Sequence, residues 1–137
     1  MKMDPSAFVA DPELIQALEK RSTAILCGGD RVLFTQGDNP QGLFIIDQGE
    51  TTLTMMSPTG DELVSIQASA GSLLGLPGLI GNEPYSLTAI ARDGAQISFI
   101  PREEVTSLMR TAPSLALKML QVLAAEVRSA RHALSNL

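Results

Sequence analysis

The sequence predicts a mainly β domain with helices at its two ends, and two features of the chain support this fold class. Between Thr23 and Ile100, short apolar or β-branched segments alternate with turn residues, a spacing typical of an all-β sandwich or barrel. Helical patterns lie only before and after this region, which excludes the strand–helix alternation of a parallel sheet. The predicted strands are TAIL, RVLFTQ, GLFIIDQ, TTLTMM, ELVSIQ, SLTAIA and AQISFI.

Three helices are predicted outside the strand region. Residues 11–21 form a short helix, because Asp11 is a capping residue and Pro12 suits the first helical position. A second short helix starts at Pro101, with glutamates in its first turn, where the helix dipole favours acids. A long helix then starts near Pro113 and continues to the end of the chain.

The last helix contains the most regular apolar pattern of the sequence. Its apolar residues recur at alternating spacings of three and four, as in a coiled coil, where such a stripe faces a partner helix. We therefore expect a homodimer, although the same stripe could instead pack on the chain's own β domain. The predicted interface comprises Leu120, Leu123, Val127, Ala130, Leu134 and Leu137.

Composition excludes several classes of function. The 137 residues suffice for one domain, and the net charge of −5 argues against direct nucleic-acid binding. No apolar stretch approaches the roughly 18 residues of a membrane span. One cysteine, Cys27, fits a reducing cytoplasm, and one histidine, His132, leaves no catalytic or metal-binding constellation. We expect a cytoplasmic protein that is not an enzyme and needs no cofactor or metal.

The segment from Gly71 to Ala91, GSLLGLPGLIGNEPYSLTAIA, has the glycines of a binding loop but not its charges. It contains one acid, Glu83, and no base. The whole stretch from Val32 to Ala91 lacks Lys, Arg and His. An anionic ligand held there would be buried without a positive partner, which is energetically costly.

The order of the elements and two motifs, VLFTQGD and GLFIIDQGE, resemble the cyclic-nucleotide-binding domain of the catabolite-activator/FNR superfamily. The resemblance covers residues 11–137. It implies an antiparallel, jelly-roll-like β-roll of about eight strands whose long C-terminal helix pairs with that of a second subunit. The implied organisation is an N-terminal tail at 1–10, the β-roll with flanking helices at 11–112, and the dimerisation helix at 113–137.

Family members that bind cyclic nucleotides carry a phosphate cassette, Phe-Gly-Glu-Leu-Ala/Gly-Leu, followed by Arg-Ser/Thr-Ala. In this chain the matching runs are LGLPGL and YSL, so Leu76 replaces the ribose-binding Glu and Tyr85 replaces the phosphate-binding Arg. Pro77 also removes a backbone donor, and Arg131 on the last helix could supply a cation from above. The candidate ligand-binding residues are Leu74, Gly75, Leu76, Gly78, Leu79, Tyr85, Ser86 and Arg131.

The expected function is a non-catalytic regulatory domain that binds cAMP or cGMP weakly, with dissociation constants above roughly 100 μM, or not at all. Such a domain would act as a scaffold or bind another small effector. The alternative is a genuine cyclic-nucleotide effector domain of a transcription regulator whose helix-turn-helix is absent from this chain. Tyr85 has two possible orientations: inward, with its hydroxyl bonded to a carbonyl or water, or outward, with Ser86 facing the cavity.

Overall fold

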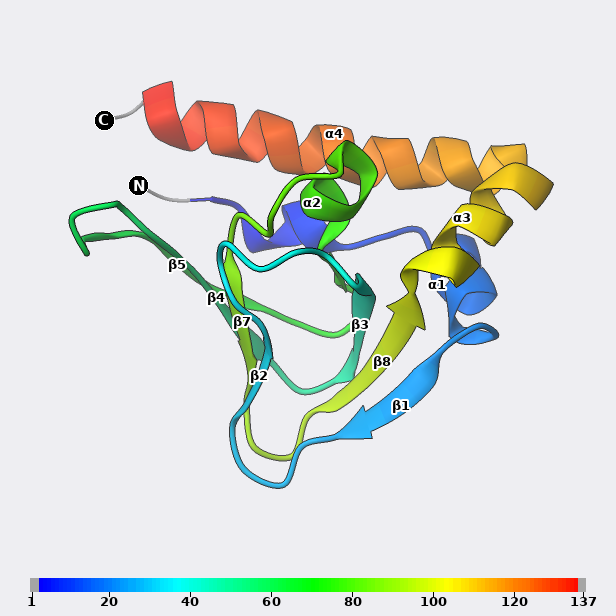
Figure 1. Cartoon of the computed structure of the whole chain (residues 1–137), viewed down its shortest axis with the longest axis horizontal. Helices are drawn as coiled ribbons and strands as arrows, with labels where there is room; N and C mark the ends of the chain where they lie inside the picture. The colour runs from blue at the N-terminus through cyan, green and yellow to red at the C-terminus, as the bar shows by residue number, and fades with distance from the viewer. Residues whose placement is uncertain (1–2, 136–137) are drawn as a thin grey trace.

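The computed structural model describes residues 3–135, and side chains up to residue 133. Eight strands form an antiparallel β-roll with a helix before it and two helices after it, so the predicted fold class is confirmed (Figure 1). The strands are β1 (Thr23–Leu26), β2 (Arg31–Phe34), β3 (Gly42–Gln48), β4 (Thr51–Met56), β5 (Glu62–Ala68), β6 (Leu73–Leu74), β7 (Thr88–Ala91) and β8 (Gln96–Pro101).

The strands form two four-stranded sheets. One has the order β1-β8-β3-β6 and the other β2-β7-β4-β5, with antiparallel pairing throughout. On β5, Val64, Ile66 and Ala68 are buried while the residues between them are exposed, the alternation of a strand with one solvent face. The interior of the roll therefore lies between the two sheets.

Strand β3 separates two apolar cores. Phe44 and Ile46 belong to the core inside the roll, which we call the roll core. Leu43 and Ile45 point to the opposite face and belong to a second core, the helical core, built mainly with residues of the helices. Because both faces of β3 are covered, its burial is continuous from residue 42 to residue 46.

Four α-helices cover the roll: α1 (Pro12–Glu19), α2 (Leu76–Gly81), α3 (Arg102–Thr111) and α4 (Pro113–Ser135). The predicted cap of α1 is present, since the Asp11 side chain accepts a hydrogen bond from the Glu13 N–H at 2.8 Å. Pro101 precedes α3 as its N-cap rather than opening it. Helix α4 runs along one side of the molecule (Figure 1). No described helix meets the length and hydropathy needed to cross a bilayer.

The segment predicted as an N-terminal tail contains ordered structure. Residues Pro5–Phe8 form a 3₁₀ helix, η1, which packs on α4 and β5. The Phe8 side chain is only 2% exposed and belongs to the roll core. The backbone N–H of Asp4 donates to the Ser129 hydroxyl of α4 at 2.8 Å. These contacts attach the start of the described chain to the terminal helix.

Candidate functional site

The glycine-rich segment folds as the short strand β6 followed by α2, and Gly75 joins the two. Gly75 has a φ of +98°, a left-handed conformation that side chains disfavour. A Cβ at this position would lie 3.1 Å from the Tyr85 ring and 3.3 Å from the Gly42 carbonyl. Gly75 is therefore required both for the turn and for the close approach of Tyr85.

Helix α2 has two different faces. Leu76 and Leu79 are buried in the helical core. Gly75, Pro77 and Gly78 instead line a cavity on the side of the roll core. Leu76 and Leu79 were both predicted to contact the ligand, but neither lines the cavity. The turn at Gly75 directs these two side chains into the helical core instead.

Of the inward and outward orientations that the sequence allows, Tyr85 has the inward one. Its ring stacks on Phe34 with 4.1 Å between ring centroids, and its hydroxyl donates to the Gly42 carbonyl at 2.8 Å. Ser86 also lines the cavity, so the two neighbours both contribute to its wall. This is possible because they precede the first residue of β7, Thr88, and strand alternation does not apply to them.

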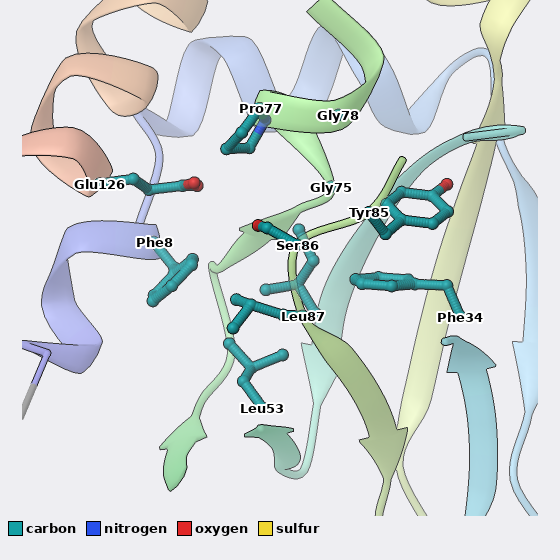
Figure 2. Close-up of a pocket in the computed structure, with 11 residues that line it drawn as sticks. Phe8, Phe34, Leu53, Gly75, Pro77, Gly78, Tyr85, Ser86, Leu87 and Glu126 are labelled. Atoms are coloured by element: carbon teal, nitrogen blue, oxygen red, sulfur yellow. The ribbon is translucent and has the colours of Figure 1, made fainter. Parts of the chain in front are cut away.

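The cavity beneath α2 is small. Its volume is about 20 Å³, enough for a single water molecule but too small for a cyclic phosphate with its ribose. The stacked pair of Phe34 and Tyr85 occupies one side of it (Figure 2). No Lys, Arg or His lines it among the described residues. The lining residues are Phe8, Phe34, Leu53, Leu74, Gly75, Pro77, Gly78, Tyr85, Ser86, Leu87 and Glu126.

A larger apolar cavity of about 180 Å³ adjoins the first one. The two share five lining residues: Phe8, Pro77, Ser86, Leu87 and Glu126. Met55 of β4, Val127 and Ala130 of α4, and Met3 complete the larger cavity. We call these two adjoining cavities, which lie between the roll and α4, the α4 pocket.

Glu126 is the residue that the sequence analysis missed. Its side chain extends from α4 into the pocket, between Phe8 and Pro77 (Figure 2). The residue is 5% exposed, and its Oε1 atom is buried with no hydrogen-bond partner among the described residues. Burial raises the pKa of this carboxyl from 4.5 to about 8. A buried, unpaired carboxyl is an unusual component of an apolar helix face.

The predicted dimer stripe on α4 divides between two environments. Leu120 and Val127 are 45% and 42% exposed. Leu123 and Ala130 are half-buried, and they pack on the helical core and the roll core. Leu134 and Leu137 lie outside the side chains that the structure describes.

The remaining predicted ligand residue on α4, Arg131, is exposed and does not line the α4 pocket. The described residues contain no group of three or more His, Cys, Asp or Glu placed to hold a metal. Cys27 is buried. The chemistry of the site therefore comes from Glu126, Ser86 and the backbone around Gly75.

Comparison with known proteins identifies relatives of this architecture. The family model described as the cyclic nucleotide-binding domain matches residues 28–112. The cyclic AMP receptor protein of Thermus thermophilus is 28% identical over 98 residues, which are 72% of this chain and 45% of that protein. The chain thus spans less than half the length of this curated relative.

Solved structures agree with this assignment at the level of the fold. The Thermus thermophilus catabolite activator protein superposes with a TM-score of 0.79 at 24% identity, covering 96% of this chain and 62% of that one. The c-di-GMP-responsive regulator CLP of Xanthomonas campestris gives a TM-score of 0.67 at 20% identity, covering 90% and 59%. With the family model covering more than half of its residues, the chain belongs to the cyclic nucleotide-binding domain family, a family of non-catalytic regulatory domains.

Proposed function

We propose that this chain is a dimeric sensor domain that binds cAMP and cGMP weakly or not at all, and that acts as a scaffold or responds to another small effector. The observation that carries this proposal is the 20 Å³ cavity beneath α2, in which the Tyr85–Phe34 stack occupies the space and no base is present. A phosphate placed there would lack the charged partner that such an anion needs.

Glu126 supports the same proposal. An ionised carboxylate that is buried at this site repels a cyclic phosphate, and a protonated one supplies only a neutral hydrogen bond. Either form is less suited to an anion than a buried arginine would be. The missing positive partner and the added acid both weaken nucleotide binding.

A second candidate function is that of a cyclic-nucleotide effector domain in a longer transcription regulator. The family match and the likeness to a receptor more than twice as long as the aligned segment favour it. This candidate requires the wall of the cavity to open, with Tyr85 leaving Phe34. Binding of a cyclic dinucleotide such as c-di-GMP, to which CLP responds, belongs to the same candidate.

Calorimetric titration with cAMP, cGMP and c-di-GMP separates the two candidates. We expect dissociation constants above roughly 100 μM for cAMP and cGMP. A dissociation constant near 1 μM for either would refute the proposed function and favour the second candidate.

The dimer is proposed to form through the exposed face of α4. Leu117, Leu120 and Val127 are 58%, 45% and 42% exposed, and they recur along one side of the helix. Light scattering should give twice the monomer mass at tens of micromolar. Val127→Glu should raise the dimer dissociation constant by about 100-fold because it places a charge in an apolar contact. Glu103→Gln, on the exposed side of α3, serves as the control.

A further inference from the structure

The most unusual group in the molecule is the carboxyl of Glu126. It lies on the buried face of α4, where the neighbouring buried residues Met119, Val122 and Ala133 are all apolar. Burying a carboxyl without a partner costs free energy, and Leu or Met would fill this position more stably. Folding alone therefore does not account for Glu126, whereas a ligand that pairs with it would.

We propose that the α4 pocket binds a small organic amine whose ammonium group pairs with Glu126 and whose apolar body fills the larger cavity. The proposal rests on the proposed function, since it names the class of effector that the site takes in place of a nucleotide. The geometry points to the nitrogen lying between Glu126 and the Ser86 hydroxyl, both of which line the two parts of the pocket.

The charge of the pocket selects a cation. Two ionisable side chains line it among the described residues, Glu126 and Tyr85. The Tyr85 hydroxyl is already bonded to the Gly42 carbonyl, and α2, β4 and η1 contribute no charged side chain to the lining. An ammonium would therefore meet one carboxylate and no competing positive charge, an arrangement in which the attraction is strengthened because that carboxylate is only 5% exposed.

The shape of the pocket limits the size of the ligand. A dry cavity of about 150 Å³ in another protein holds one benzene ring, so the 180 Å³ part of the α4 pocket suits a body of about one ring. Met3, Met55 and Leu87 line this part. Methionine side chains adapt readily to an apolar ligand. A compact aromatic or branched aliphatic amine matches these dimensions.

Binding of such an amine has a proton signature. The pKa of Glu126 is raised to about 8, so the carboxyl is largely protonated at pH 7. When the ammonium binds, the carboxyl releases its proton to the solvent and becomes the carboxylate that pairs with the nitrogen. The protein therefore releases up to one proton for each amine bound at pH 7.

Three matched probes test the proposal by calorimetry with the intact chain: benzylamine, benzyl alcohol and benzoate. We expect benzylamine to bind at least about tenfold more tightly than benzyl alcohol, and benzoate not to bind. Titrations in buffers of different ionisation enthalpy should show proton release with benzylamine. Glu126→Gln should weaken benzylamine binding at least about tenfold and abolish proton release, while Glu103→Gln changes neither.

A second measurement locates the probe. In a methyl-labelled methionine NMR spectrum, the Met55 and Met3 signals should shift with benzylamine, because these residues line the pocket. Met109 serves as an internal control, since it packs on the helical core. This readout does not depend on any variant being folded.

The outcomes separate this inference from the proposed function. Benzylamine that binds no better than benzyl alcohol, binds Glu126→Gln equally well, or leaves Met55 unshifted overturns the inference. The proposed function stands in each of these cases as long as cAMP and cGMP also bind weakly. Nucleotide binding near 1 μM overturns the proposed function, whatever the amine result.

Discussion

The two halves of α4 differ in what they place against the domain. In the first half, Met119 and Val122 are 0% and 6% exposed and fill the helical core. In the second half, Glu126 faces a hollow, with Ala130 beside it. The first half follows the rule that a buried helix face is apolar, and the second half breaks it.

This difference separates the residues that hold the helix from those available for binding. The helical core includes aliphatic side chains from α1, α2, β3 and α3 as well as α4, and all of its buried members are apolar. The region around Glu126 is incompletely filled, so its side chains can change with less effect on packing. A violation of local rules at one place in a well-packed domain is characteristic of functional sites.

The largest predicted effect comes from restoring the family's charged residues with Leu76→Glu and Tyr85→Arg. Leu76 is 0% exposed in the helical core, so a carboxylate there should cost at least about 4 kcal/mol of unfolding free energy. Urea denaturation should show loss of most of the stability of the domain, with no gain in nucleotide affinity. Leu63→Glu, at a position that is 39% exposed on β5, should change stability little.

A folded double variant that binds cAMP with a dissociation constant near 1 μM would contradict the contrast between the helical core and the region around Glu126. It would mean that α2 can turn its Leu76 face toward the cavity. The single substitutions identify the cause, since Leu76→Glu tests the helical core and Tyr85→Arg tests the stack on Phe34.

A smaller, pH-dependent effect is expected for Glu126→Gln. Because burial raises the Glu126 pKa from 4.5 to about 8, the folded protein binds more protons than the unfolded protein between these values. The stability of the wild type therefore falls as the pH rises through this range. At pH 7 the Gln variant should be more stable by about 3 kcal/mol, and at pH 4 the two should be equal.

Urea denaturation at pH 4, 5.5, 7 and 8 measures this difference, and Glu103→Gln provides the matched control. If the gain of the Gln variant does not vary with pH, Glu126 already has a partner in solution. That result would remove the contrast between the two halves of α4.

The smallest predicted effect is that of Tyr85→Phe. The substitution keeps the stack on Phe34 but removes the hydroxyl that donates to the Gly42 carbonyl and accepts from the Gln41 N–H at 3.2 Å. Unfolding free energy should fall by about 1 to 2 kcal/mol. A change of less than a few tenths of a kcal/mol would show that the hydroxyl does not hold this side of the pocket.

Much of the fold could be predicted because its signals are local. Alternating strands, capping residues such as Asp11 and the glycines at turns all appear in short stretches of sequence, and the family resemblance was confirmed by the matching family model. The two-residue strand Leu73–Leu74 was not predicted, because so short a strand has no periodicity of its own. The packing of Phe8 depends on contacts with distant elements and has no local signal either.

The candidate site was predicted only in part. Leu74, Gly75, Gly78, Tyr85 and Ser86 do line the cavity. The direction of Leu76 depends on the left-handed turn before it, which the sequence alone does not reveal. Glu126 could have been found, since it lies four residues after Val122 and seven before Ala133, on the buried stripe of α4. The competing stripe through Leu120 and Val127 is more regular.

The stack of Tyr85 on Phe34 also gives the molecule a built-in optical reporter. The chain has one tyrosine and no tryptophan, so its fluorescence on excitation beyond the phenylalanine absorption band arises from a single ring at the edge of the α4 pocket. Tyr85 is 4% exposed, and its hydroxyl donates a hydrogen bond to the Gly42 carbonyl. Both conditions affect the intensity of its fluorescence. Any compound that enters the pocket or displaces the ring changes this emission directly. Libraries of unlabelled effectors can therefore be screened on the unmodified protein by its own fluorescence.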